Sequence, residues 1–377
     1  EGANEAEANV TLTSNKSVFS VVLADDSWLS YTISGTIVTF KAKSKNTTGN
    51  IRTTIATITA GTGAAAKAVE VTVNQNVAAE GDASLELSTN TVTITPDAVA
   101  KSEVITMISD ETEFAINITD ESWVKAYVDV TSKTLYFWTL SPNLNSSSRV
   151  TTATVIAGNG ANAPKQEVTI TQRGLLSSEF AVGQVIADNG SLKGGIVFWV
   201  DATNRGKAKI MSLDRENLAW STAGSPASTG VTLSNDDGLA NTTALAALPN
   251  AAEMPALKYC MDKGSGWYWP TRSDLEQMFE TYNGTKVADA TEDNPNAITD
   301  FEKANRAAWD LIVTNVGGTA MNTAAASSTG DSYWASRETS SGTNAFYVRF
   351  GKPLAWDKAN GKKSGARYIR AVRSISK

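Results

Sequence analysis

The stretch Asp25-Asp26-Ser27-Trp28-Leu29 decides the fold class, because it returns further along the chain as Asp120-Glu121-Ser122-Trp123-Val124. The two tryptophans lie 95 positions apart. Landmarks that keep their order and spacing indicate a tandem duplication. Two later landmarks support it, because they repeat at an offset of 97 positions: Arg52 as Arg149, and Gln75 as Gln172.

Both copies are predicted to consist of short strands. Period-two alternation and β-branched runs indicate strands. Turn signals such as Thr48-Gly49-Asn50 separate these runs. We therefore expect two all-β, immunoglobulin-like sandwiches, over residues 1–79 and 80–174. In the first copy the expected strands are Val18–Leu23, Ile37–Lys41, Ile51–Thr59 and Val69–Asn74.

The remaining segment, residues 175–377, combines strands with helices and is predicted to be an α+β domain. Long loops at Ser221–Thr242 and Val287–Thr299 join its elements, and loops on a compact scaffold often carry binding surfaces. Ser273 and Glu276 form a capping-box pattern at the start of one helix. The expected helices are Ala251–Lys263, Asp274–Tyr282 and Phe301–Val316, and the expected strands are Gly195–Asp201, Ala208–Leu213, Ala345–Phe350 and Tyr368–Arg373.

Composition excludes several classes of function. The chain has 377 residues, about the length of two or three domains. Its formal net charge of −6 argues against nucleic acid as a partner. Because it contains no histidine, histidine-based triads and histidine metal sites are ruled out. Cys260 is the only cysteine, so an internal disulfide and a cysteine-rich zinc site are ruled out as well.

The two repeated modules resemble BACON domains, which are immunoglobulin-like modules common in surface proteins of Bacteroidetes. The resemblance rests on the Ser-Trp-hydrophobic step, on an Asn-rich loop that runs into arginine, and on a last strand ending at Gln75 or Gln172. The family often has a small residue beside the tryptophan, where this chain has Leu29 and Val124. The family name implies carbohydrate binding, although many such modules look like spacers.

The C-terminal segment resembles the C-type-lectin-like domains found at the ends of such Bacteroidetes proteins. The resemblance implies a domain that binds its ligand without a covalent step. The matching stretches keep their order over nearly the whole segment: Gly194–Asp201, Leu213-Asp214, Trp220-Ser221, Gly266–Thr271, Tyr333–Ser336 and Tyr368–Arg373.

The end of the chain also resembles the variable region of proteins that are diversified by retroelements. In such regions, arbitrary residue types lie between fixed scaffold positions, and the diversified surface implies a protein ligand. The scaffold-like residues here are Tyr333, Trp334, Ser336, Glu338, Ala345, Tyr347, Val348, Phe350 and Ala371–Arg373. Aromatic and arginine side chains on a rigid frame are frequent binding hot spots. The candidate ligand contacts are Arg337, Thr339, Phe346, Arg349, Trp356, Asp357 and Arg367.

The repeated tryptophans have both a functional and a structural interpretation. Trp28 and Trp123 offer faces on which sugar rings stack, but large aromatic residues at repeated positions favour the core. The alternation at Trp267-Tyr268-Trp269 predicts two buried tryptophans on one face and the tyrosine on the other.

The sequence around Trp356 allows two interpretations of this residue. It lies in a polar stretch, Gly351–Gly365, that shows no apolar periodicity. An exposed ligand contact and partial burial at the base of a loop are equally compatible with this pattern.

Calcium is the cofactor to consider, because many C-type lectins hold sugar through it. Calcium takes six to eight oxygen ligands, often from several carboxylates. The candidates are Asp236-Asp237, Glu292-Asp293-Asn294 and Asp300, but the Glu-Pro-Asn and Trp-Asn-Asp motifs are absent. We therefore expect solvated acids and no cofactor.

No enzymatic activity is expected. A related lectin-like fold houses formylglycine-generating enzymes, which use paired cysteines, whereas Cys260 is alone and is expected to be buried and inert. Glycosidases need two carboxyl groups that flank a cleft. Glu276, Glu280 and Glu302 are interpreted instead as solvated faces of helices.

The expected location is the cell exterior. The chain starts at Glu1 in a polar stretch without Met, which indicates a mature terminus behind a removed signal. We expect a lipid-anchored protein of the cell surface or outer membrane, with the β modules as a stalk and the C-terminal domain binding a protein or a glycan. The alternatives are a glycan-binding adhesin with sugar contacts in the β modules, and a divergent lectin-fold enzyme.

Overall fold

The computed structural model describes residues 7–44, 46, 50–77, 84–159, 163–187, 194–222, 228–285, 299–322, 331–340, 342–350 and 356–377, except for the side chains of 356–360. The chain divides into two compact units. The first unit consists of Glu1–Glu86, Ile108–Ala115 and Ile156–Lys165, and the second of Leu87–Met107, Ile116–Val155 and Gln166–Lys377.

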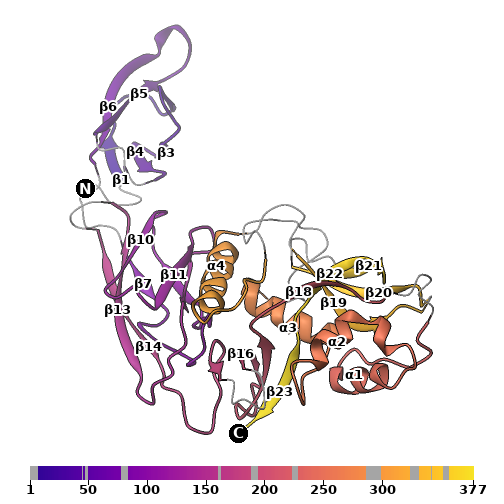
Figure 1. Ribbon diagram of the computed structural model, residues 1–377. Helices are drawn as coiled ribbons and strands as arrows, with labels where there is room; N and C mark the ends of the chain where they lie inside the picture. Colours follow the sequence, from indigo (N-terminus) through magenta and orange to yellow (C-terminus); the bar gives the residue numbers. More distant parts are fainter. Residues whose placement is uncertain are drawn as a thin grey trace. The chain divides into compact units, whose positions relative to one another are not determined.

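The first β module is a sandwich of two sheets (Figure 1). Both sheets contribute to one core, in which Val21, Trp28 and Phe40 are buried. The four strands predicted from alternation are confirmed with small shifts at their ends. One sheet has the order β1-β4-β3 (Glu7–Thr11, Ile37–Ala42, Leu29–Ser34), and the other has the order β2-β5-β6 (Phe19–Leu23, Arg52–Ala60, Lys67–Gln75).

The second β module repeats this arrangement and extends each sheet by one strand. The added strand β8 (Thr91–Ile94) pairs in parallel with the last strand β14 (Lys165–Gln172). The all-β sandwich architecture predicted for both modules is therefore confirmed. The sheets are β10-β13-β14-β8 and β11-β12-β9-β7, which adds β7 (Glu86–Leu87), β9 (Ile105–Ile108), β10 (Phe114–Ile118), β11 (Val124–Asp129), β12 (Thr134–Thr139) and β13 (Arg149–Ala157).

The C-terminal segment combines two further sheets with helices. The first sheet has the order β15-β16-β17-β23 (Val185–Ile186, Gly195–Val200, Lys207–Ser212, Val372–Ser376). The second has the order β18-β22-β19-β20-β21 (Glu216–Ala219, Ala366–Ile369, Ser332–Glu338, Asn344–Arg349, Trp356–Lys362). The α-helices are α1 (Gly238–Ala246), α2 (Pro255–Met261), α3 (Arg272–Asn283) and α4 (Asp300–Asn315).

Several sequence-based predictions for this segment are wrong in detail. Helix α1 begins inside the stretch expected to be the loop Ser221–Thr242, because Asp237 caps it by accepting a hydrogen bond from Ala240 N at 2.9 Å. The expected helix Ala251–Lys263 is a 3₁₀ turn followed by the shorter α2, which starts at Pro255. Residues 356–362 form the edge strand β21 instead of a loop.

The predicted end of the chain and the predicted cap of α3 also need correction. The single strand expected at Tyr368–Arg373 is two strands in different sheets, β22 and β23, because the fully buried Arg370 occupies the connection between them. The capping box of α3 is formed by Thr271 and Asp274, not by Ser273 and Glu276. Helix α4 confirms the prediction Phe301–Val316 within one residue at each end.

The core of the C-terminal segment consists of two apolar clusters. Trp267 and Trp269 belong to one cluster, together with Trp220 and Trp334. Tyr268 belongs to the other. The predicted division of these three aromatic residues between two faces is confirmed, and it results from the alternation of an extended chain.

Within the larger unit, helix α4 packs against the second β module (Figure 1). The ring of Phe301 lies 5.3 Å from that of Trp138 on β12, centroid to centroid. Arg205, between β16 and β17, adds a second link from the C-terminal segment to this module, because its Nη2 donates to Asp97 Oδ1 at 2.6 Å. Among the residues that the structure describes, no helix has the length and apolar character of a membrane span.

Candidate binding site

The candidate ligand contacts all lie on or beside one sheet, β18-β22-β19-β20-β21. Arg337 is on β19, Phe346 and Arg349 are on β20, and Arg367 is on β22. The residues between them are buried, and both faces of the sheet face a core cluster. These buried residues are Tyr333, Trp334, Ser336, Ala345, Tyr347, Val348 and Phe350. The four candidates named above are half-buried, so each leaves part of its side chain at the surface.

Arg337 and Phe346 form one group. The Arg337 guanidinium carbon lies 5.6 Å from the centroid of the Phe346 ring. Arg337 Nη1 also donates to Asn235 Oδ1 at 2.7 Å, which holds the guanidinium in place over the ring. A fixed cation beside an aromatic ring suits contacts with polar and aromatic groups of a ligand.

Arg349 and Arg367 lie on the other face of the sheet. Trp334 pairs with Tyr347 and Ser332 with Arg349, so these side chains share a face by the alternation of strands. Arg367 lies over the Trp334 and Tyr347 rings of that face. The sheet therefore does not bring all the predicted contacts together, but divides them between two faces.

Arg367 is held by aromatic packing. Its guanidinium carbon lies 4.0 Å from the centroid of the Tyr347 ring and 4.5 Å from that of Trp334. Gly361 lies close to this guanidinium, because a Cβ added at Gly361 would be 2.4 Å from Arg367 Nη2. Much of this side chain therefore serves the packing of the sheet.

Arg349 is less constrained. It is half-buried, and its guanidinium has no hydrogen bond or ion pair with any residue that the structure describes. Arginine without an internal partner keeps all its donors for a ligand. Of the predicted contacts with described side chains, Arg349 is thus the one best placed to bind.

The remaining predicted contacts differ in position. Thr339 is only 8% exposed, and its Oγ1 donates to Asn344 O at 3.2 Å, which closes the β19–β20 connection. Trp356 and Asp357 lie on the edge strand β21, but their side chains lie outside the described residues. The open question about the burial of Trp356 therefore stays open.

A buried ion pair beside the sheet was not predicted from the sequence. Lys363 Nζ donates to Glu338 Oε2 at 2.5 Å, and Ser228 Oγ and Thr229 Oγ1 each donate to Glu338 Oε1 at 2.9 Å. Burial alone would raise the pKa of Glu338, but the hydrogen bonds from Lys363, Ser228 and Thr229 outweigh it and lower that pKa. The pair links the end of β19 to the residue after β21. The sequence around Lys363 is polar and did not indicate that this lysine is buried.

The acids considered for calcium have other roles where the structure describes them. Asp237 caps α1, Asp236 Oδ1 accepts a hydrogen bond from Ser273, and Asp300 is paired with Lys303 at 2.9 Å. Glu292-Asp293-Asn294 lies outside the described residues. Within the described ranges, no three or more Asp, Glu or Cys side chains gather as they would around a metal ion.

Of the four groups considered for catalysis, Glu276 and Glu280 are half-buried on α3. The prediction for Cys260 is confirmed and that for Glu302 is wrong. Cys260 is fully buried, which confirms the prediction, and burial raises the pKa of its thiol well above the usual value. Glu302 is also buried, contrary to the expected solvated face, because its carboxylate caps α4 and accepts a hydrogen bond from Asn283 Nδ2 at 2.8 Å.

The tryptophans of the β modules are core residues, as predicted. Trp28 is 6% exposed and Trp123 is 4% exposed. An arginine covers each ring, with the guanidinium carbon of Arg52 4.9 Å from Trp28 and that of Arg149 4.6 Å from Trp123. Neither indole offers a free face for a sugar ring.

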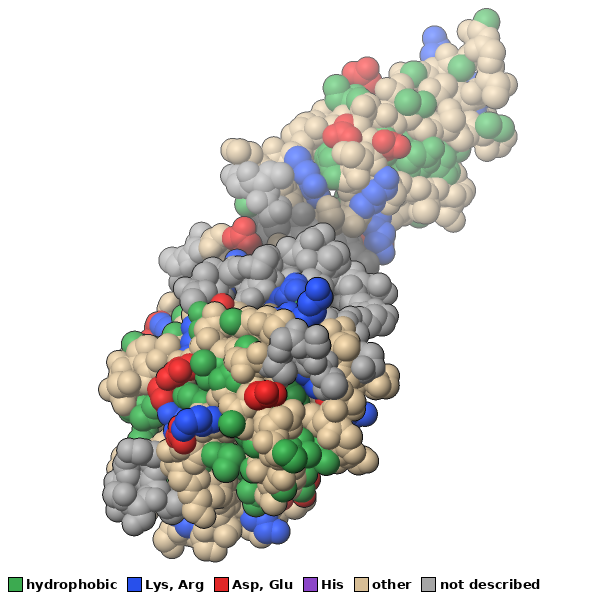
Figure 2. All heavy atoms as spheres, turned by 45° about the vertical axis from the view of Figure 1, so that its right-hand side comes forward, with side chains coloured by type: hydrophobic (Ala, Val, Ile, Leu, Met, Phe, Trp, Pro, Cys, Tyr) green, Lys and Arg blue, Asp and Glu red, His purple; other side chains and the backbone are tan. Residues whose placement is uncertain are grey.

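Figure 2 shows one face of the molecule, where Lys and Arg side chains lie among Asp and Glu side chains and small apolar groups. Single-sign patches attract oppositely charged polymers, whereas mixed charge does not. The described residues in this view carry charges of both signs.

No protein-family model matches the chain, and no curated protein matches it. Similar solved structures include the human desmocollin-1 ectodomain, at 11% identity over 43% of this chain and 35% of that one, with a TM-score of 0.26. Mouse cadherin-23 gives 14% identity over 42% and 54%, with a TM-score of 0.24. The chain spans less than two thirds of each of these structures, and similarities this low carry no argument about function.

Proposed function

We propose that the protein is an exported binding protein of the cell surface, attached to the outer membrane by a lipid anchor. Its two β modules, which resemble BACON domains, act as a stalk. Its C-terminal domain, which resembles C-type-lectin-like domains, binds a protein ligand without a covalent step. The exposed parts of Arg337, Phe346 and Arg349 supply contacts to that ligand.

The observation that supports this proposal is a difference in burial within the sheet β18-β22-β19-β20-β21, between the scaffold-like positions and the candidate contacts. The positions interpreted as scaffold from β19 and β20 are buried, and the side chain of Glu338, whose residue as a whole is half-buried, is only 8% exposed. Arg337, Phe346 and Arg349 lie between them and are half-buried. The exposed parts of Arg337 and Arg349 can change without disturbing the packing beneath them, which is what a diversified binding surface requires. Phe346 also packs against an apolar cluster of the core.

The alternative of sugar binding by the tryptophans of the β modules is less well supported. Stacking on a pyranose ring needs an open aromatic face. The rings of Trp28 and Trp123 are buried and lie under Arg52 and Arg149. A glycan adhesin of this type would need other contacts.

The test of the proposed function is a ligand screen with the intact protein. A panel of purified cell-surface proteins and a glycan array are probed in parallel, with wild-type protein and with Arg349→Ala. The proposal expects a protein ligand whose binding is weaker with Arg349→Ala. Binding to glycans alone, unchanged by Arg349→Ala, would instead favour the adhesin.

The proposed diversification has a separate test in the genomic locus. We expect a reverse transcriptase gene nearby, and a near-copy of the segment encoding Tyr333–Arg373 that differs mainly at adenines. Polysaccharide-utilisation genes in place of both would contradict diversification and move the ligand search to glycans.

A further inference from the structure

Strand β20 ends at an arginine that lies directly opposite a serine of β19. Ser332 of β19 pairs with Arg349 of β20. In the next pair along the two strands, Phe350 N donates to Asp331 O at 2.8 Å. Hydrogen-bonded and non-hydrogen-bonded pairs alternate along antiparallel strands, so Ser332 and Arg349 form the kind whose side chains approach most closely. The Cβ atoms of such a pair are about 4.5–5.5 Å apart.

Neither side chain of this pair has a partner within the described part of the chain. Ser332 and Arg349 are both half-buried, so each keeps part of its surface accessible. The Ser332 hydroxyl and the Arg349 guanidinium make no hydrogen bond or ion pair with any residue that the structure describes. A guanidinium donates through several N–H groups, and a hydroxyl donates through one O–H. The pair therefore presents unused donors side by side.

A second arginine lies on the other side of Ser332. The parallel register of β19 and β22 pairs Tyr333 with Tyr368, which places Arg367 next to Ser332. The Arg367 guanidinium lies over two aromatic rings of the same face. It has no hydrogen bond or ion pair with a described residue, and its Nε is buried without an acceptor. Two arginines without acidic partners thus flank β19 on one face of the sheet.

The acids nearest to these arginines are already paired. Glu338 is the only acid in the strands β22, β19 and β20, and its carboxylate is bound to Lys363. Asp331, just before β19, is paired with Arg215 at 2.6 Å. Positive charge that no acid balances attracts anions. This face therefore favours an anionic group of a ligand, although the whole chain has a net charge of −6.

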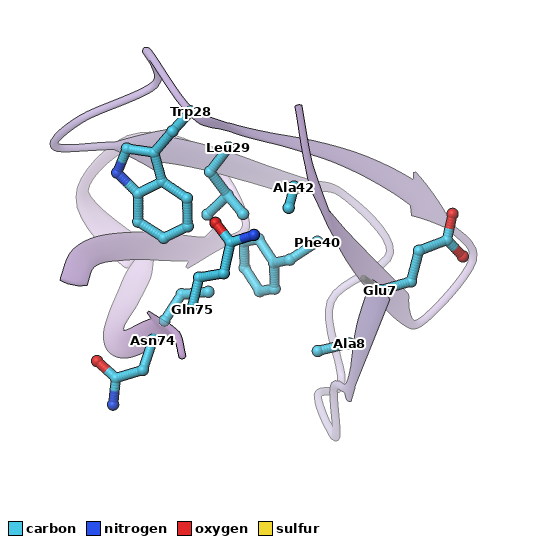
Figure 3. A pocket seen from close by; sticks show the side chains of 9 residues that line it. Glu7, Ala8, Trp28, Leu29, Phe40, Ala42, Asn74 and Gln75 are labelled. Atoms are coloured by element: carbon cyan, nitrogen blue, oxygen red, sulfur yellow. The ribbon is translucent and has the colours of Figure 1, made fainter. Parts of the chain in front are cut away.

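The open pocket of the first β module has the opposite charge. Its volume is about 180 Å³, and Figure 3 shows Glu7 and Ala8 of β1 across from the Trp28 indole. Glu7 is the one charged residue among the described residues that line it. Because like charges repel, a carboxylate at this position disfavours an anionic ligand. Charge thus directs such a ligand to the C-terminal domain and not to this module.

We propose that the protein ligand presents the carboxylate of an Asp or Glu side chain, which Arg349 and Ser332 bind together. This inference rests on the proposed function, because it names the chemistry that the same sheet recognises. A guanidinium donates two parallel hydrogen bonds to the two oxygens of a carboxylate. The Ser332 hydroxyl donates a further one from the opposite strand. Arg367 adds a positive charge on the same face, where the aromatic rings hold it.

The variant Ser332→Asp tests this geometry without a ligand. Its carboxylate lies opposite Arg349 and supplies the partner that the wild-type protein lacks. Opposite charges that face each other across antiparallel strands stabilise the pair. The urea midpoint of Ser332→Asp should therefore exceed that of Ser332→Asn, the neutral side chain of the same shape, and the difference should shrink at high salt. Equal midpoints at low salt would overturn the proposed pairing.

Recognition of the carboxylate is tested with two short peptides, polyglutamate and polyglutamine, titrated into the intact protein at low salt. We expect saturable binding of polyglutamate only. Arg349→Ala and Ser332→Asp should each weaken this binding by about tenfold, the first by removing the donors and the second by occupying them. Lys258→Ala removes a positive charge from helix α2 and is the matched control, which should bind like the wild type.

Equal binding of the two peptides, or polyglutamate binding that Arg349→Ala leaves unchanged, would overturn the inference. So would a uronic acid oligosaccharide that binds where polyglutamate does not, because the ligand would then be an acidic glycan. The ligand screen decides the proposed function separately. A protein ligand that Arg349→Ala weakens, but that Ser332→Asp binds as well as the wild type does, would uphold the function and reject this inference.

Discussion

In both β modules an arginine side chain lies over the ring of the repeated tryptophan, at the edge of the core. In the second module Arg149 Nε donates to Gln172 Oε1 at 2.7 Å, and Nη2 donates to Ser141 O at 2.8 Å. The same side chain lies over the Trp123 ring. Arginine suits this position because its planar group can stack on a ring and donate in two directions at once.

Replacing this arginine should destabilise the second module. Arg149→Ala removes the ring contact and leaves Gln172 Oε1 without its donor, so we expect the free energy of unfolding to fall by about 2–4 kcal/mol. Arg149→Lys should recover only part of the loss, because an ammonium cannot make both hydrogen bonds while stacking. Urea denaturation measures both, and a Lys variant as stable as the wild type would refute this role.

The ion pair between Glu338 and Lys363 should give a pH-dependent contribution to stability. Both side chains are nearly inaccessible, at 8% and 1% exposure. Lys363→Met leaves the carboxylate buried without its partner and should cost about 3–5 kcal/mol near neutral pH. Because the pKa of Glu338 is lowered in the folded state, the stabilisation is present above the unfolded value of 4.5 and is lost as the pH falls through the folded value.

The check is a comparison of urea midpoints of wild type and Lys363→Met across this range. The difference between the two proteins should be large at neutral pH and should shrink well below pH 4.5. A difference that stays constant with pH would mean that packing of the lysine stem, and not its charge, stabilises the fold.

At the scale of single elements, two residues at the start of helix α3, Thr271 and Ser273, are of types that cap helices. Thr271 Oγ1 accepts from Asp274 N at 3.1 Å and is fully buried. Thr271→Ala should therefore lower the free energy of unfolding by about 1–2 kcal/mol. Ser273→Ala, at the cap expected from the sequence, should change it by less than about 0.5 kcal/mol. Thermal unfolding compares the two, and the reverse order would contradict the cap assigned here.

The strands of the β modules could be predicted because their signal is local. Each has β-branched residues and period-two alternation, as in β5 and β13, where buried positions alternate with more exposed ones. Helix α3 and helix α4 were predictable for the same reason, since both are amphipathic and have a cap. The burial of the tryptophans followed from their repeated positions.

Other elements could not be predicted because distant contacts decide them. Helix α1, with the sequence Gly-Leu-Ala-Asn-Thr-Thr-Ala-Leu-Ala, is short and consists mostly of small residues. Its Asn241 is buried and donates a hydrogen bond to Ser336 Oγ at 2.8 Å. Strand β21 has the polar composition of a loop, and its pairing with β20 makes it a strand. Arg370 is fully buried because its Nη1 donates to Ser212 O at 2.7 Å, across the domain.

At the scale of the whole molecule, Phe301 is the main apolar link between α4 and the second β module. Its ring lies against those of Tyr127, Tyr136 and Trp138, and Lys101 Nζ lies 4.1 Å from its centroid. The prediction is that Phe301→Ala costs about 3–5 kcal/mol and splits one calorimetric transition into two. Leu311→Ala, at a 59% exposed position of the same helix, is the matched control and should leave the transition unchanged. A single transition in Phe301→Ala would show that the two parts unfold together without this link.

The central claim is that the sheet β18-β22-β19-β20-β21 binds the ligand. The most direct measurement is the dissociation constant of the intact protein for a ligand found in the screen, with Arg349→Ala compared against Lys258→Ala and Lys303→Ala. These two lysines are exposed on helices α2 and α4 and belong to no strand of that sheet. We expect Arg349→Ala to weaken binding by about tenfold or more and the lysine variants to have no effect. Unchanged binding by Arg349→Ala, or an equal loss in all three variants, would contradict the account.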